Sequence, residues 1–180
     1  MDYASRDLRE EHEGILFGLK ILEKMANLLM EKEKVEVADI KDMVAFFQVF
    51  ADKCHHGKEE GFLFPAMEKY GIPRENGPIG QMLSEHVEGR KYIARMVDTA
   101  KDDLKTDGFI DAARHYINLL RSHIDKENNV LFPLGDKKIP PDVQAELLES
   151  FEKYEAEVMG EGTHEKLHTL LNAFEKKYLS

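Results

Sequence analysis

The sequence predicts an all-α protein: an up-down-up-down four-helix bundle with two additional C-terminal helices. Apolar residues recur at helical spacing almost throughout the 180 residues, and no segment shows a sustained strand-like alternation. Four long periodic segments follow one another through short connections, which is the pattern of an antiparallel bundle. We therefore expect a single domain over residues 1–180.

Charged, Gly-rich or Pro-rich stretches separate the predicted helices. The clearest loop is Gly71–Gly80, and Pro140–Pro141 begin the C-terminal part. We expect the bundle to occupy residues 5–135 and the helical extension residues 140–180, laid across or beside the bundle. The expected helices cover residues 5–31, 37–70, 79–104, 107–134, 142–160 and 163 to the C-terminus.

Composition and charge narrow the functional classes. The net charge of -10 argues against a nucleic-acid partner, because phosphate-backbone sites need clustered Lys and Arg. Cys54 is the sole cysteine, so neither an intrachain disulfide nor a cysteine-based zinc site is expected. No run of about 18 apolar residues predicts a membrane span, and the first residues do not have the pattern of a signal peptide. We therefore expect a cytoplasmic protein with no membrane partner.

A repeat is the most informative feature of the chain. HHGKEEGFLFP (His55–Pro65) and HIDKENNVLFP (His123–Pro133) align without gaps and share His, Lys-Glu and Leu-Phe-Pro. Each contains His-x-x-x-Glu, which places the His and the Glu on one face of a helix. One such pair is common by chance, whereas two pairs in the same register on alternate helices indicate a shared role.

Each of the other two bundle helices supplies one histidine, His12 in EEHEG and His86 in SEHVEG. Both halves of the bundle therefore contain a His helix followed by a His-x-x-x-Glu helix, which predicts an internal duplication about a pseudo-twofold axis. Helical phase puts His12, His86, His123 and Glu127 on apolar stripes that face the core. Because an ionised core Glu is costly unless a cation meets it, these groups predict a buried two-metal site.

The donor set suggests which metal would bind. Imidazole with carboxylate suits iron, manganese or zinc, and bridging carboxylates favour an octahedral pair over tetrahedral zinc. With about six positions per iron, four His and two bridging Glu leave places for a bridging oxygen and for an exogenous ligand such as dioxygen (O2), nitric oxide (NO) or peroxide. A hydrogen-bonded polar layer is the alternative interpretation, but symmetric duplication of so costly a layer favours metal. A ferritin-like oxidase would need Glu-x-x-His pairs on core helices, and those of this chain crowd its tail.

Over about residues 5–135 the order of these motifs resembles the hemerythrin-like HHE cation-binding family, and the tail resembles members with an extra C-terminal helix pair. The resemblance implies a non-haem di-iron centre of two iron ions, oxo- or hydroxo-bridged. The implied metal ligands are His12, His55, Glu59, His86, His123 and Glu127, with both Glu bridging. The family's oxygen carriers have a further His where this chain has Arg90, which makes reversible oxygen storage less secure.

From this resemblance we expect a metal-binding protein that carries, stores or senses oxygen or nitric oxide. Two alternatives stay open: a di-iron redox enzyme acting on peroxide or nitric oxide, and an iron donor for iron-sulfur cluster repair.

Several further residues have a structural and a functional interpretation. His56 and Glu60 lie opposite the apolar stripe of their helix, so we expect them to be exposed. Tyr116 either packs in the core or places a hydroxyl above the metals, and Arg90 either extends to the end of the bundle or controls ligand charge. HEKLH (His164–His168) matches a zinc-protease motif without its third ligand or cleft, so we expect these His to cap or pack the last helix, with an extra metal site as the lesser alternative.

Overall fold

The computed structural model describes residues 2–180, which form six continuous helical stretches and, within that range, no strand. Some stretches contain π-helical segments, labelled η, in which hydrogen bonds join residues i and i+5. The first four stretches are α1 (Ala4–Met30); α2 (Val37–Phe46), η1 (Phe47–His56), η2 (Glu59–Leu63) and α3 (Phe64–Lys69); α4 (Pro78–Thr99); and α5 (Thr106–Lys126), η3 (Glu127–Leu131) and α6 (Phe132–Lys138). The last two are α7 (Pro141–Met159), and α8 (Thr163–Phe174) with η4 (Glu175–Leu179). The predicted all-α class is confirmed.

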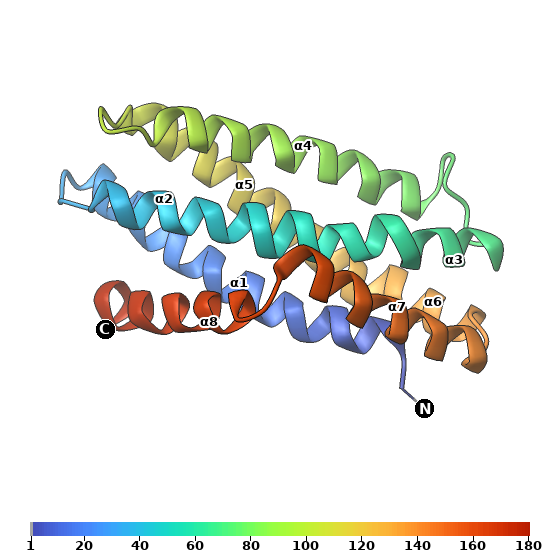
Figure 1. The fold of residues 1–180 in the computed structure, drawn as a ribbon. Helices are drawn as coiled ribbons and strands as arrows, with labels where there is room; N and C mark the ends of the chain where they lie inside the picture. Colours follow the sequence, from blue (N-terminus) through green and yellow to red (C-terminus); the bar gives the residue numbers. More distant parts are fainter. Residues whose placement is uncertain (1) are drawn as a thin grey trace.

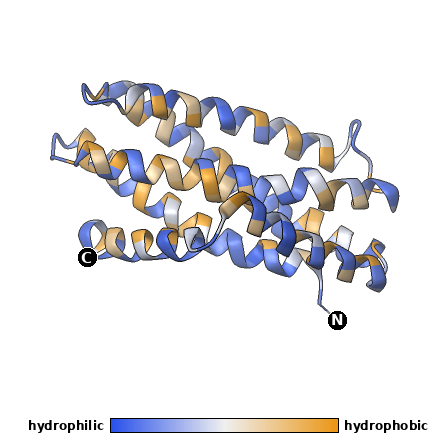
Figure 2. Ribbon diagram, in the orientation of Figure 1, coloured by the Kyte–Doolittle hydropathy of each residue, from blue (hydrophilic) through white to orange (hydrophobic). Residues whose placement is uncertain are grey.

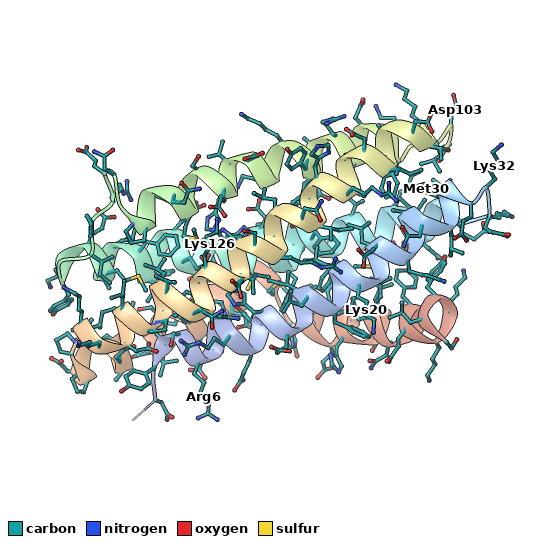
Figure 3. The ribbon with its side chains drawn as sticks, turned by 180° about the vertical axis from the view of Figure 1, so that it is seen from behind. Arg6, Lys20, Met30, Lys32, Asp103 and Lys126 are labelled. Atoms are coloured by element: carbon teal, nitrogen blue, oxygen red, sulfur yellow. The ribbon has the colours of Figure 1, made fainter. Side chains whose placement is uncertain are left out.

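The first four stretches form an antiparallel bundle (Figure 1). α1 packs against η1 and α5, and α4 packs against α5 and η1. Lys32 and Asp103, in the connections that follow α1 and α4, lie at the same end of the bundle (Figure 3). Gly18 allows α1 to approach the second stretch closely, because a Cβ there would lie 2.6 Å from the ring of Phe46. This is the up-down-up-down arrangement expected from the sequence.

The interior of the bundle is layered along its axis. One apolar cluster, which includes Leu19 and Phe47, fills one end, and another, which includes Leu8 and Phe64, fills the other. Buried His and Glu side chains lie between them. In Figure 2 the second helical stretch is correspondingly orange over α2 and blue to white in its middle. Each large apolar side chain that is fully buried stabilises the fold by roughly 1.5–3 kcal/mol, and the two clusters hold the polar layer away from water.

Two helix ends differ from the sequence-based expectation. α4 ends at Thr99 rather than near residue 104, because Lys101–Asp103 are exposed and offer no apolar face to bury. The N–H of Lys105 instead donates to the carbonyl of Thr99 at 3.0 Å. The fourth stretch continues past residue 134 to Lys138 and ends before Pro140, which disfavours a helical conformation in the residue that precedes it.

The two C-terminal helices lie end to end along one side of the bundle, beside α1 and the second stretch (Figure 1). Gly160 and Gly162 have φ angles of 70° and 77°, which favour glycine and separate α7 from α8. At Gly57 the second stretch approaches α7 so closely that a Cβ would collide with the hydroxyl of Tyr154, and this hydroxyl donates to the carbonyl of Lys53 at 2.8 Å. No helix among residues 2–180 combines the length and the apolar character that a membrane crossing needs.

Candidate metal centre

Seven side chains from four helical stretches form the buried polar layer. It contains all six residues predicted from the sequence, each at most 1 % exposed: His12, His55, Glu59, His86, His123 and Glu127. The seventh is His56, which is 4 % exposed. Their donor atoms fall into two groups, each within 4.8 Å and able to hold a metal ion. The first group is His12, His55, Glu59 and Glu127, and the second is His56, Glu59, His86 and His123.

Each carboxylate of this layer faces histidines of both halves of the bundle. The four approaches of a carboxylate oxygen to an imidazole Nε2 are 3.3 Å for Glu59 Oε1 to His55, 3.1 Å for Glu59 Oε2 to His86, 3.2 Å for Glu127 Oε2 to His12, and 3.2 Å for Glu127 Oε1 to His123. Each carboxylate thus directs one oxygen to each of two imidazole groups, so both sides of the layer offer a carboxylate oxygen next to imidazole nitrogens that could hold a cation.

The expectation that His56 is exposed is wrong. Its ring is buried and stacks on His86, with 3.8 Å between the ring centroids. The expectation assumed an α-helical phase, whereas Phe47–His56 form the π-helical segment η1. Because a π-helix has more residues per turn than an α-helix, side chains at its end point in other directions than the α-helical phase predicts. His55 and His56 therefore both reach the interior.

π-helical segments accompany the ligand motif in both halves. η1 ends at His56 and η2 begins at Glu59, and in the other half η3 begins at Glu127. Such segments are rare and occur frequently at functional sites. We found no sequence signal for them, although the repeat places η2 and η3 at equivalent positions.

The outer ring nitrogen of every histidine in the layer is held by a polar side chain. The Nδ1 contacts are 2.8 Å for His55 to Glu11, 3.3 Å for His123 to Glu85, 2.7 Å for His12 to Asn128, 2.8 Å for His86 to Glu60, and 3.4 Å for His56 to Asp52. In metal-binding proteins, contacts of this kind fix the orientation of the ring and leave Nε2 free to bind the metal.

Sequence reasoning missed these outer partners. Glu60 was expected to be exposed, but its side chain is 31 % exposed and is held by His86 and Arg90. The sequence does contain a signal for two of the other partners, since Glu11 and Glu85 each stand directly before the single histidine of their helix, His12 on α1 and His86 on α4.

The electrostatics of the layer suit a cation. Burial alone would lower the pKa of His55 and His123, but attraction to their paired carboxylates raises it to about 10 for each. Burial alone would raise the pKa of Glu59 and Glu127, but the imidazoles around them lower it. Burial and the proximity of His86 lower the pKa of His56 to about 3. The carboxylates are thus ionised, and metal ions would replace the protons that neutralise them.

Donor atoms of the layer lack hydrogen-bond partners, which fits a metal site. Among residues 2–180, the buried side-chain nitrogen and oxygen atoms without a partner are Nε2 of His12 and of His55, both oxygens of Glu59 and of Glu127, and the hydroxyl of Tyr116. All but the Tyr116 hydroxyl belong to predicted ligands. Buried carboxylate oxygens without a hydrogen bond are costly, and a divalent cation between the two carboxylates would meet these atoms.

The structure also places the residues that had two interpretations. Tyr116 is fully buried in the apolar cluster with Phe47, and burial raises the pKa of its hydroxyl well above the usual value. Arg90 does not extend to the end of the bundle; it binds Asp52 and Glu60. His164 and His168 are exposed on α8 and belong to none of the potential metal-binding groups among residues 2–180.

A four-helix bundle with buried His and His-x-x-x-Glu groups at its centre defines a hemerythrin-like cation-binding protein. The family model described as the hemerythrin HHE cation-binding domain matches residues 4–135. The chain belongs to this family, and its buried His and Glu cluster could hold the cation. Neither the curated proteins nor the solved structures gave a match. Helices α7 and α8 lie outside the matched residues.

Proposed function

We propose that the chain holds two iron ions in its polar layer and uses them to bind a small exogenous ligand: dioxygen, nitric oxide or peroxide. One observation carries this proposal, namely that Glu59 and Glu127 each direct one oxygen toward each of two histidine groups. The first ion would be held by His12 and His55, and the second by His56, His86 and His123. Glu59 belongs to both groups, and Glu127 would be shared through its contacts with His12 and His123.

The number of donors supports iron rather than zinc. Two imidazoles and two carboxylate oxygens would hold the first ion, and three imidazoles and one oxygen of Glu59 the second. Oε1 of Glu127, which lies 3.2 Å from Nε2 of His123, would add a fifth donor to the second ion. Five donors exceed the four that structural zinc takes and approach the six of an octahedral ion. The first position has the smaller number of donors, so we propose that the exogenous ligand binds there. Bound iron would supply the redox chemistry, while the chain orients the imidazoles and excludes water with its apolar clusters.

His56 also bears on the choice between carriage and other functions. The family's carriers have a further His at the position of Arg90, and that departure weakened the prediction of oxygen carriage. In the structure His56 supplies a third imidazole to the second group from a different helix. This observation supports carriage, storage or sensing as the leading function.

The proposal is tested by metal analysis and optical spectroscopy of protein purified without oxygen, before and after exposure to oxygen. We expect about two irons per chain and a reversible oxygen adduct. Rapid bleaching with consumption of peroxide would favour the redox enzyme instead. One zinc ion per chain near His164 and His168, with no metal in the polar layer, would contradict the proposal.

A further inference from the structure

Arg90 joins two carboxylates, those of Asp52 and Glu60, on the outer side of the polar layer. It lies on α4, one turn after His86. Its Nε donates to Asp52 Oδ1 at 2.9 Å, and its Nη2 donates to Glu60 Oε1 at 2.7 Å. The Arg90 side chain is 38 % exposed and lines a surface hollow of about 500 Å³ together with both carboxylates and Tyr154.

The same two carboxylate oxygens hold two of the candidate ligands. Glu60 Oε1 lies 2.8 Å from Nδ1 of His86, and Asp52 Oδ1 lies 3.4 Å from Nδ1 of His56, the long end of a hydrogen bond. The two imidazole rings are stacked. A single guanidinium therefore links the outer supports of both rings, and its planar group with donors in fixed directions suits this double contact.

This arrangement occurs in only one half of the duplicated bundle. When the two halves are aligned on their histidines, Asp52, His56, Glu60 and Arg90 correspond to Leu120, Ile124, Asn128 and Leu16. Three of the four counterparts are apolar and cannot form such a network. The third imidazole and the Arg90 network thus occur together, on the same side of the site.

We propose that Arg90 is a positioning residue for the second metal ion. By fixing Asp52 and Glu60 it keeps Nε2 of His56 and of His86 directed into the layer, and so it allows His56 to act as the third imidazole. This inference rests on the proposed two-metal function and concerns only the second position. Arg90 itself would touch neither ion, since its contacts are with Asp52 and Glu60.

The test is an anaerobic titration of the metal-free protein with Co(II), and then with Fe(II), followed optically. Arg90→Gln removes both charge-assisted contacts, Arg90→Lys keeps the charge without the double contact, and Arg121→Gln is the matched control. Arg121 is 39 % exposed and makes a paired contact with Glu23 on the surface, away from the layer. Circular dichroism of the metal-free forms checks that each variant folds.

We expect wild type and Arg121→Gln each to bind two ions, and the Kd for each ion should be the same in the two proteins. In Arg90→Gln the Kd of the second ion should rise on the order of 10-fold, which is the lower end of the usual effect of changing an outer partner of a metal ligand. Arg90→Lys should fall between them. In the Co(II) form the N–H proton signals of His56 and His86 should exchange faster with water in Arg90→Gln, while those of His12 and His55 stay unchanged.

Two outcomes would overturn the role of Arg90: equal affinities in Arg90→Gln and wild type, or the same loss in Arg121→Gln. A wild-type chain that takes up only one ion would overturn the two-metal function itself, and the inference with it. The titration of the wild type therefore separates the two failures.

Discussion

Each half of the bundle has an equivalent pair of Glu and Lys beside the polar layer, but the surroundings of the two pairs differ. In the first half, Lys58 binds Glu11 at 2.6 Å, and in the second half the equivalent Lys126 binds Glu85 at 2.6 Å. The Lys58 side chain is fully buried, whereas that of Lys126 is 41 % exposed. Figure 3 shows Lys126 on the fourth stretch, where it directly precedes Glu127 of the polar layer.

The difference arises from the C-terminal extension. Glu155 of α7 lies 3.3 Å from Lys58, and the ammonium group lies 5.5 Å from the ring of Phe151, also of α7. The extension therefore covers the outer partners of the first half, while Lys126 stays partly open to solvent. The duplication supplies six of the seven side chains of the polar layer, and the helices outside the duplication make its two sides unequal.

The largest loss of bound metal is expected at the two carboxylates, Glu59 and Glu127, which face histidines of both halves. Glu59→Ala and Glu127→Ala should each reduce the metal content from about two ions per chain to below one, because each carboxylate faces both histidine groups. Elemental analysis after loading measures this, with Glu23→Ala, on the surface, as the control. If either variant keeps two ions, the carboxylates do not bridge.

Replacing the adjacent histidines should separate the two positions. We expect His55→Ala and His56→Ala each to lose about one ion per chain, from the first and the second group respectively. Mössbauer spectra of the iron-loaded variants distinguish which ion is retained. Full iron content in His56→Ala would return the ligand set to the six residues predicted from the sequence.

Replacing the two lysines should show the inequality of the halves most directly. Lys58→Met leaves Asp7, Glu11 and Glu155 without their common cation, and loss of one partner from a buried ion pair costs about 3–5 kcal/mol. Lys126→Met removes a partly exposed partner and should cost about 1 kcal/mol or less. Urea unfolding of the metal-free proteins measures both. Equal losses would mean that α7 does not cover the first half.

The dependence on pH should be common to both halves. His55 and His123 have pKa values raised to about 10 in the metal-free protein, so their stabilisation is complete below about pH 6.5 and is lost as the pH rises through about 10. Metal binding must displace these protons and should therefore strengthen over the same range. We expect the Tm difference between loaded and metal-free protein to widen from about pH 6 to about pH 9. A gap that narrows would contradict the protonated state of these histidines.

The smallest effect is expected at Tyr116, whose hydroxyl has no partner among residues 2–180. Removing an unpaired buried polar group relieves its desolvation penalty. Tyr116→Phe should raise the unfolding free energy of the metal-free protein by up to about 1 kcal/mol and leave the metal content unchanged. A loss of exogenous-ligand affinity in the loaded variant would show instead that the hydroxyl contacts that ligand.

The sequence by itself determined the all-α class and the six residues that the fold brings together. A gap-free repeat and an apolar stripe are local periodic signals, and an α-helix converts them directly into faces. On α1 and α5 the phase argument was correct, because Leu8, Ile15 and Leu120 lie at α-helical spacing from the buried histidines of these helices.

Only the tertiary structure decided the place of His56, the outer partners and the inequality of the halves. The position of His56 depends on the π-helical segment η1, for which the sequence has no recognisable residue pattern. Arg90, Asp52 and Glu60 come from two helices, and Lys58 and Glu155 are 97 residues apart. Contacts between distant segments leave no periodic trace in a single sequence, so they become visible only when the helices are packed.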